Sequence, residues 1–178
     1  ALRAAVRVEL WGPYASPGAI DCSGRPYWTG TFTANGDGTY TTAPVRLTRA
    51  GYYTYREAIL PGEATDGVAT ACGQAAETTL TIAAPTVTTV SSADVVRPGS
   101  RITDRIRVRG LGSTAARIDV ELFGPFASRA QLDCTGTPVS TGRVFPQGDG
   151  TVRTKPVRLS RVGFYVWREH LVGTAVVR

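Results

Sequence analysis

The sequence predicts an all-β chain built from two tandem β-sandwich domains, and two observations lead to this prediction. First, residues 44–57 (PVRLTRAGYYTYRE) recur at residues 156–169 (PVRLSRVGFYVWRE), with nine of fourteen positions identical at an offset of 112 residues. Second, short β-prone runs are separated by Gly-Pro, Asn-Gly and Asp-Gly turn signals. Short strands at such spacing are typical of a sandwich.

The repeat extends over much of both copies without a gap. At the same offset three further blocks match, namely residues 8–16 with 120–128, 21–22 with 133–134, and 36–39 with 148–151. An ungapped repeat of this length indicates two copies of one domain rather than a solenoid. We therefore expect copy one at residues 1–83, without its first strand, and copy two at residues 86–178, without its last strand. Such a chain is expected to be part of a longer repeat array, or a protomer completed by strands of a neighbour.

Copy one is expected to begin with a half-buried strand, because Val6, Val8 and Leu10 alternate with charged residues. Residues 27–33 and 39–42 are β-prone and flank the sequence Asn-Gly-Asp-Gly at positions 35–38. Such turn residues between such runs predict a β-hairpin. Further strands are expected around Val45 and Leu47, at residues 52–59 and at residues 78–82.

Copy two follows a short linker at residues 83–85 and is expected to begin with a strand at residues 86–90. In the next strand, at residues 101–108, one face carries Ile102, Ile106 and Val108 together with Asp104. The other face carries four arginines: Arg101, Arg105, Arg107 and Arg109. They can attract an anionic surface glycan or polymer. Alternatively, they form a charged solvent face that prevents an edge strand from pairing with other chains.

The three cysteines predict one disulfide within copy one. Cys134 is the repeat-mate of Cys22, whereas the mate of Cys72 would fall after the last residue. Cys22 and Cys72 are therefore expected to be bridged, and two buried free thiols are the alternative. Cys134 is then free or paired with another chain. A disulfide indicates an oxidising compartment, so we expect an extracellular or cell-surface location.

Composition argues against several functional classes. The hydrophobic content of 42% is that of a globular domain, and the net charge of +6 is concentrated in copy two. One histidine and three scattered cysteines cannot assemble a four-ligand metal site. There is no apolar run of membrane-spanning length, and no aromatic residues that would stack on nucleic-acid bases are interleaved with the arginines. We expect no metal, cofactor, nucleic acid or membrane insertion.

Several motifs resemble the immunoglobulin-like stalk domains of Gram-positive, actinobacterial-type surface adhesins and pilins. They are ITDRIRVRGL at residues 102–111, GYYTYRE and GFYVWRE in the two copies, and ETTLTI at residues 77–82. The resemblance implies tandem immunoglobulin-like β-sandwich domains. Members of that family often carry an isopeptide or Thr-Gln ester crosslink. The only lysine, Lys155, has Ala43 as its repeat-mate, and Glu77 stands where an ester would need glutamine. The resemblance therefore implies the fold without the crosslink, with the disulfide as the staple.

The same resemblance matches Asp104 to the acid of the first strand, and Glu57 and Glu169 to the family's catalytic glutamate. These three residues are candidate buried acids with raised pKa values. The alternative is that each glutamate is a structural carboxylate paired with an arginine. We expect Asp104 and Glu169 to lie close together, with Arg168 or Arg105 as the counter-ion.

The sequence thus favours a structural segment of an extracellular repeat protein, a stalk, filament or adhesin, with no enzymatic activity. It is expected to associate end to end, through neighbouring repeats or by strand addition between chains. A binding module for anionic cell-surface polymers is the alternative. An enzyme is disfavoured, because no constellation of acid, base and nucleophile recurs in both copies.

Overall fold

The computed structural model describes residues 2–63 and 65–178. About 46% of the chain is β-strand, arranged in antiparallel sheets, so the all-β prediction is confirmed. Helical structure in the described residues is limited to the 3-10 turns η1 (Pro17–Ala19), η2 (Ala75–Glu77) and η3 (Arg129–Gln131). The chain divides into two compact units, Ala1–Ile82 and Ala83–Arg178, here called unit 1 and unit 2.

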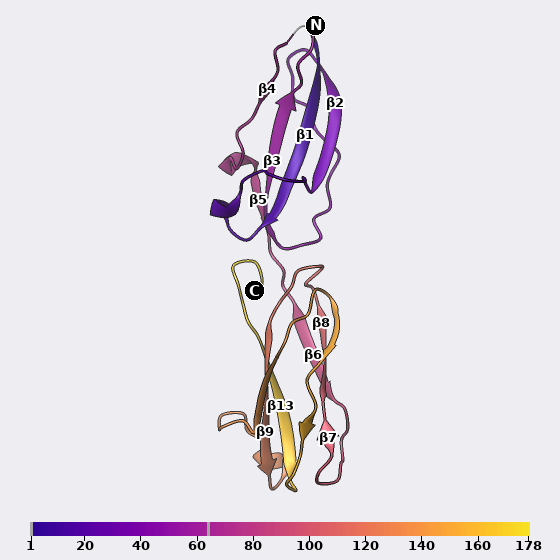
Figure 1. Ribbon diagram of the computed structural model, residues 1–178, viewed down its shortest axis with the longest axis vertical. Coiled ribbons are helices and arrows are strands. Elements are labelled where there is room, and N and C mark those ends of the chain that lie inside the picture. The colour runs from indigo at the N-terminus through magenta and orange to yellow at the C-terminus, as the bar shows by residue number, and fades with distance from the viewer. Residues whose placement is uncertain (1, 64) are drawn as a thin grey trace. The chain divides into compact units, whose positions relative to one another are not determined.

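Unit 1 contains one antiparallel sheet (Figure 1). The strand β1 (Arg3–Tyr14) lies between β2 (Trp28–Asn35) and β3 (Gly51–Ile59). The other edge of β3 pairs with β4 (Val68–Ala69) and β5 (Thr78–Thr81). The alternation read from the sequence is seen in the burial of β1, where Val6, Val8 and Leu10 form the core with Trp11 and Tyr53.

Unit 2 contains two three-stranded sheets and a short strand pair. One sheet has the order β10 (Ser140–Val144), β9 (Ile118–Phe126), β13 (Phe164–Leu171). The other has the order β11 (Gly150–Arg153), β8 (Asp104–Arg109), β6 (Thr86–Ser91). The pair is β7 (Arg101–Ile102) with β12 (Val157–Arg158).

The core of unit 2 contains inward-facing residues of both sheets. Ile106 and Val108 of β8, and Val120 and Leu122 of β9, are almost completely buried. Ile102 of β7 packs with Leu122 and with Leu159, which follows β12. Each such aliphatic side chain contributes about 1.5–3 kcal/mol when fully buried. Two antiparallel sheets with a shared apolar interior make a sandwich-like fold.

The strand register repeats between the units. In unit 1, Val8 of β1 pairs with Gly30 of β2 on one side and with Glu57 of β3 on the other. In unit 2, Val120 pairs in the same way with Gly142 and Glu169, each 112 residues later. The bulged end of each long strand contains a cis Gly-Pro bond, at Gly12-Pro13 and Gly124-Pro125. The sequence repeat is therefore also a repeat of local structure.

The hairpin expected around residues 35–38 of copy one is wrong, and so is the strand expected around Val45 and Leu47. In unit 1, residues 39–48 form no strand. In unit 2, β10 pairs with β9, whereas β11 pairs with β8 in the other sheet. The segment between β10 and β11 is therefore a crossing between sheets, anchored by the Asp149 carboxylate, which accepts a 2.7 Å hydrogen bond from the Leu111 amide. Among the described residues of unit 1 no strand corresponds to β8, so residues 39–42 lack the partner that β11 has in unit 2.

Candidate functional site

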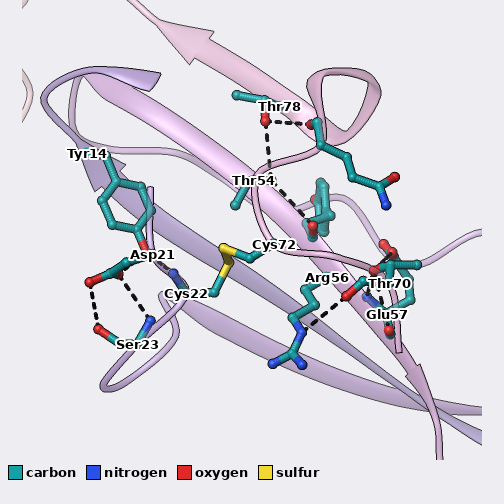
Figure 2. The surroundings of a disulfide bond; sticks show 12 residues. Tyr14, Asp21, Cys22, Ser23, Thr54, Arg56, Glu57, Thr70, Cys72 and Thr78 are labelled. Carbon is teal, nitrogen blue, oxygen red and sulfur yellow. Dashed lines mark hydrogen bonds between the residues drawn. A yellow bond between two sulfur atoms is a disulfide. The ribbon is translucent and has the colours of Figure 1, made fainter. Parts of the chain in front are cut away.

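The disulfide joins Cys22 to Cys72, with an S–S distance of 2.03 Å and 5.9 Å between the two Cα atoms. It connects the loop after β1 to the segment that leads into β5 (Figure 2). The sequence separation of the two cysteines is 50. Closing a loop of that length removes roughly 4 kcal/mol of chain entropy from the unfolded state. The predicted pairing is confirmed, and Cys134 is a half-buried free thiol.

A small polar network orders the loop that carries Cys22. The Asp21 carboxylate accepts hydrogen bonds from the Ser23 hydroxyl at 2.8 Å and the Ser23 amide at 3.1 Å (Figure 2). These donors lower the pKa of Asp21. The Tyr14 hydroxyl donates to Asp21 and accepts from the Cys22 amide. Asp133 and Thr135 form the same turn in unit 2, so this turn does not depend on the disulfide.

The segment that carries Cys72 is fastened to β3 by side chains as well as by strand pairing. The Thr70 hydroxyl donates to the Glu57 carboxylate at 3.1 Å and accepts from the Glu57 amide at 2.9 Å (Figure 2). Arg56 Nε donates to the Thr70 carbonyl at 3.4 Å. Glu57 is half-buried, and among the described residues its carboxylate is in no ion pair. Its partner is a threonine, not the arginine that the sequence suggested as an alternative.

Asp104 and Glu169 lie close together in unit 2, as expected. Asp104 of β8 has no exposed surface, Glu169 of β13 is half-buried, and their carboxyl groups are within hydrogen-bonding reach of one another across the two sheets. Burial raises the pKa of Asp104. Burial, and then the hydrogen bond and charge of Asp104, raise the pKa of Glu169 to about 7.

The hydrogen bonding of this pair depends on its protonation. Both Asp104 oxygens and Glu169 Oε1 are buried without a donor when the two groups are treated as carboxylates, because carboxylates only accept. When one of the two groups is protonated, its O–H can donate to the other. The Thr89 hydroxyl donates to Glu169 and favours the charged form of that group, but this effect is smaller than that of burial. The pair is therefore expected to hold one proton over a wide range of pH.

The expected counter-ions of this pair are wrong. Arg168 donates to Glu121 at 2.6 and 2.8 Å and to the Cys134 carbonyl at 2.5 Å, and its guanidinium lies 4.9 Å from the centre of the Phe123 ring. Arg105 is exposed on the outer face of β8. Adjacent residues of a strand point to opposite faces of the sheet, so an arginine next to a buried acid in sequence cannot reach it.

The arginine face of unit 2 contains the four predicted residues and two more. Arg101, Arg105, Arg107 and Arg109 are all exposed, as are Arg153 of β11 and Arg158 of β12. Arg153 is directly opposite Arg105, and Arg158 is directly opposite Arg101. None of the six is in an ion pair with another described residue. An open depression of about 510 Å³ on this face is lined by Thr88, Val90, Arg105, Arg107, Thr151 and Arg153.

The explanation that these arginines protect an edge strand is wrong for β8. That strand is the central one of its sheet, with β11 on one side and β6 on the other. Its backbone groups already have partners on both sides. Like charges directly opposite each other in a sheet are destabilising. The like-charge pairs therefore cost stability, and Arg105, Arg107 and Arg109 of β8 have no edge to protect, whereas Arg153 of β11 lies on an edge strand.

Two tyrosines at equivalent positions make a feature that we did not predict. The Tyr53 hydroxyl donates to the Arg49 carbonyl at 3.0 Å, and the Tyr165 hydroxyl donates to the Arg161 carbonyl at 2.9 Å. A tyrosine near the start of a strand that bonds back to the backbone a few residues upstream is a tyrosine corner. The signal in the sequence was the motif Arg-x-Gly-x-Tyr, which is identical in both copies at these positions.

A second depression, of about 780 Å³, lies beside Trp167, between β10 and residues 154–157 of unit 2. Among the described residues, no group of three or more histidine, cysteine or acidic side chains is placed to hold a metal ion. No helix among them has the length and apolar character needed to cross a membrane. Comparison with protein-family models, with curated proteins and with solved structures finds no match.

Proposed function

We propose that the chain is a non-catalytic structural segment of an extracellular repeat protein, a stalk, filament or adhesin, built from tandem immunoglobulin-like domains. The single observation that carries this proposal is the duplication of one β-structure in sequence and in strand register. Repeating a domain lengthens a chain without adding a new site. A chain made in this way is suited to act as a spacer.

The immunoglobulin-like assignment is supported by topology and by the tyrosine corners. Unit 2 pairs β11, β8 and β6 in one antiparallel sheet and β10, β9 and β13 in the other. Consecutive strands cross between the sheets, as β10 and β11 do. The hydroxyls of Tyr53 in β3 and Tyr165 in β13 donate to backbone carbonyls just before the strand in which each tyrosine lies. Sandwiches of this class combine these features.

An absence of catalysis is the simplest account of the two acidic positions. Asp104 and Glu169 pair in unit 2, whereas Glu57, the repeat-mate of Glu169, is bonded to Thr70 in unit 1. The only lysine, Lys155, is exposed in unit 2 and has an alanine as its repeat-mate. A crosslinking role for the acids would need a buried amine at their side. We propose a structural role for the acids and a stapling role for the disulfide, which also supports an oxidising, extracellular location.

The arginine face supports a second candidate function, which is binding of an anionic cell-surface polymer. Six exposed arginines with no acidic partner among the described residues create a positive field on one side of unit 2. Arginine recognises phosphate and carboxylate groups with two parallel hydrogen bonds. A bound polyanion would relieve the repulsion between Arg105 and Arg153, and between Arg101 and Arg158.

Stretching single molecules from their two ends tests the structural proposal. We expect a separate unfolding event for each unit, because each has its own core. Without reductant, the disulfide prevents extension of the segment between Cys22 and Cys72, whose sequence separation is 50. Reduction should therefore lengthen the extended chain by roughly 170 Å at full extension. A chain that extends smoothly, without resolved unfolding events, would contradict the proposed role as a folded structural segment.

A further inference from the structure

One edge of β13 in unit 2 lacks the strand that covers the equivalent edge in unit 1. In unit 1, β5 pairs with the start of β3, with Gly51 opposite Thr81 and Thr54 opposite Thr78. In unit 2, β13 pairs only with β9 among the described residues. The repeat offset places Gly163, Phe164, Tyr165 and Val166 at the positions that β5 covers in unit 1.

The burial of these four positions differs between the units in the same direction. Gly51, Tyr53 and Thr54 are buried and Tyr52 is half-buried. Their mates are all more accessible, since Tyr165 and Val166 are half-buried and Gly163 and Phe164 are exposed. The apolar Phe164 keeps 40% of its surface exposed and its neighbour Val162 keeps 84%. The rest of the sheet is equally buried in both units, as Leu10 at 2% and Leu122 at 0% illustrate.

Cys134 lies where a segment equivalent to residues 70–81 would be anchored. Its mate Cys22 is bonded to Cys72, which precedes β5 in the same segment. Arg168 gives an independent indication. In unit 1 its mate Arg56 donates to the Thr70 carbonyl of that segment, whereas Arg168 donates to the Cys134 carbonyl and to Glu121. Glu121 thus accepts from Arg168, whose mate in unit 1 donates instead to the segment that carries Cys72.

From these contacts we infer that the free edge of β13 accepts a further strand with the chemistry of residues 70–81. That strand is threonine-rich, runs antiparallel to residues 163–166, and carries a cysteine six residues before its first paired threonine. The cysteine forms a disulfide with Cys134. The inference rests on the proposed function, because it assumes further copies of the same domain. The occupant to which it commits is such a cysteine-bearing strand, not a second copy of this chain, in which Cys72 is already bonded to Cys22.

The bond between the two thiols is an oxidation and needs an electron acceptor. Two thiols lose two protons and two electrons, and a small-molecule disulfide that accepts them is released as two thiols. In a test the oxidising equivalent can be built into the probe. The Cys134 thiolate then attacks the activated cysteine of the peptide, the old S–S bond breaks, and the leaving thiolate takes up a proton as a coloured thione.

The probe is a synthetic peptide of residues 70–83, with its cysteine activated as a mixed disulfide with pyridine-2-thiol, added to the intact chain. The control peptide keeps the cysteine but has the residues after it in scrambled order. We expect release of the thione to be faster with the native order by about tenfold or more, because docking on β13 raises the effective concentration of the two sulfur atoms. The Cys134→Ser chain should release none.

A second measurement keeps the inference testable without the covalent step. The same peptide with Cys72→Ser should slow hydrogen exchange at the amides of residues 163–166 and leave residues 51–54 unchanged, because β5 already covers those. Equal rates for the native and scrambled peptides, or no protection at residues 163–166, would overturn the inference. A chain that instead dimerises through two Cys134 residues would also overturn it. None of these failures alters the expected unfolding of the two units under force.

Discussion

Asp104 of β8 and Glu169 of β13 bring a buried and a half-buried carboxyl group within hydrogen-bonding reach of one another inside unit 2, with no cation paired to either among the described residues. Two like charges in a dry interior repel and lose hydration, so the neutral form of one group is favoured. The two groups are therefore expected to share a hydrogen bond while one of them is protonated, and to repel one another when both are ionised. In unit 1 the Thr70 hydroxyl donates to Glu57, the repeat-mate of Glu169, and the position equivalent to Asp104 lies outside the sequence.

The first prediction concerns the pH dependence of stability. Folding raises the pKa of Glu169 from 4.5 to about 7. Between those values the folded chain binds more protons than the unfolded chain, so the free energy of unfolding of unit 2 falls as pH rises. Allowing for solvent screening of the half-buried group, we expect a loss of about 1–2 kcal/mol. Urea unfolding at a series of pH values measures it.

Matched variants isolate the contribution of Asp104 and Glu169 to this pH dependence. Glu169→Gln should be more stable than the native chain at pH 8 and should flatten the profile between pH 5 and 7, because a neutral amide can donate to Asp104 without adding a charge. Glu57→Gln is the control in unit 1 and should leave the profile in place. A free energy of unfolding of the native chain that rises between pH 5 and 7 would contradict the account.

The second prediction concerns the tyrosine corners. Tyr53→Phe and Tyr165→Phe each remove one hydroxyl that donates to a backbone carbonyl. Each should destabilise its own unit by about 1 kcal/mol, the net value of a typical hydrogen bond. Thermal unfolding of each variant measures the change. Tyr55→Phe is the control, because the Tyr55 hydroxyl has no hydrogen-bond partner among the described residues. Equal effects from all three variants would argue against the corner.

The third prediction concerns the arginine face. Arg153→Thr introduces the residue that unit 1 has at the equivalent position, Thr41. It removes the like-charge pair with Arg105 and should stabilise unit 2 by a few tenths of a kcal/mol at low salt, with a smaller effect at high salt. Arg143→Thr is the control and should instead destabilise unit 2 slightly, because Arg143 is paired with Asp119.

The same variants test the second candidate function. Polyphosphate should bind the native chain with an affinity that falls as salt rises, and Arg153→Thr should weaken that binding more than Arg143→Thr does. Isothermal titration at two salt concentrations measures both effects. Binding that is equally weak for both variants would assign it to the net charge of the chain and not to the arginine face.

Much of the fold could be predicted because the duplication supplies a second reading of each pattern. Alternation gave the inward faces of β1 and β8, including the burial of Asp104. The absence of a repeat-mate for Cys72 indicated the pairing of Cys22, and the matched motifs indicated that Asp104 and Glu169 would meet. These predictions depend on one strand, or on a comparison between copies, and the sequence carries that information directly.

Relations between strands were harder to predict. Turn residues at positions 35–38 show where the chain bends but not which sheet the next strand joins, so the hairpin was wrong. The place of β8 in the centre of its sheet, and the position of Arg153 beside Arg105, depend on partners distant in sequence. The prediction of Arg105 and Arg168 as counter-ions was wrong for a simpler reason, because adjacent residues of a strand point to opposite faces of the sheet. The register between sheets is set by packing, which no short motif encodes.

The central claim, a duplicated structural domain stapled by one disulfide and by no other crosslink, is tested most directly by intact mass after alkylation without reductant. The account predicts a mass two hydrogen atoms below that of the sequence, plus one alkyl group, which peptide mapping places on Cys134. Three alkyl groups would show that Cys22 and Cys72 are free. A further loss of water or ammonia would reveal a crosslink and contradict the non-catalytic role proposed for the acids.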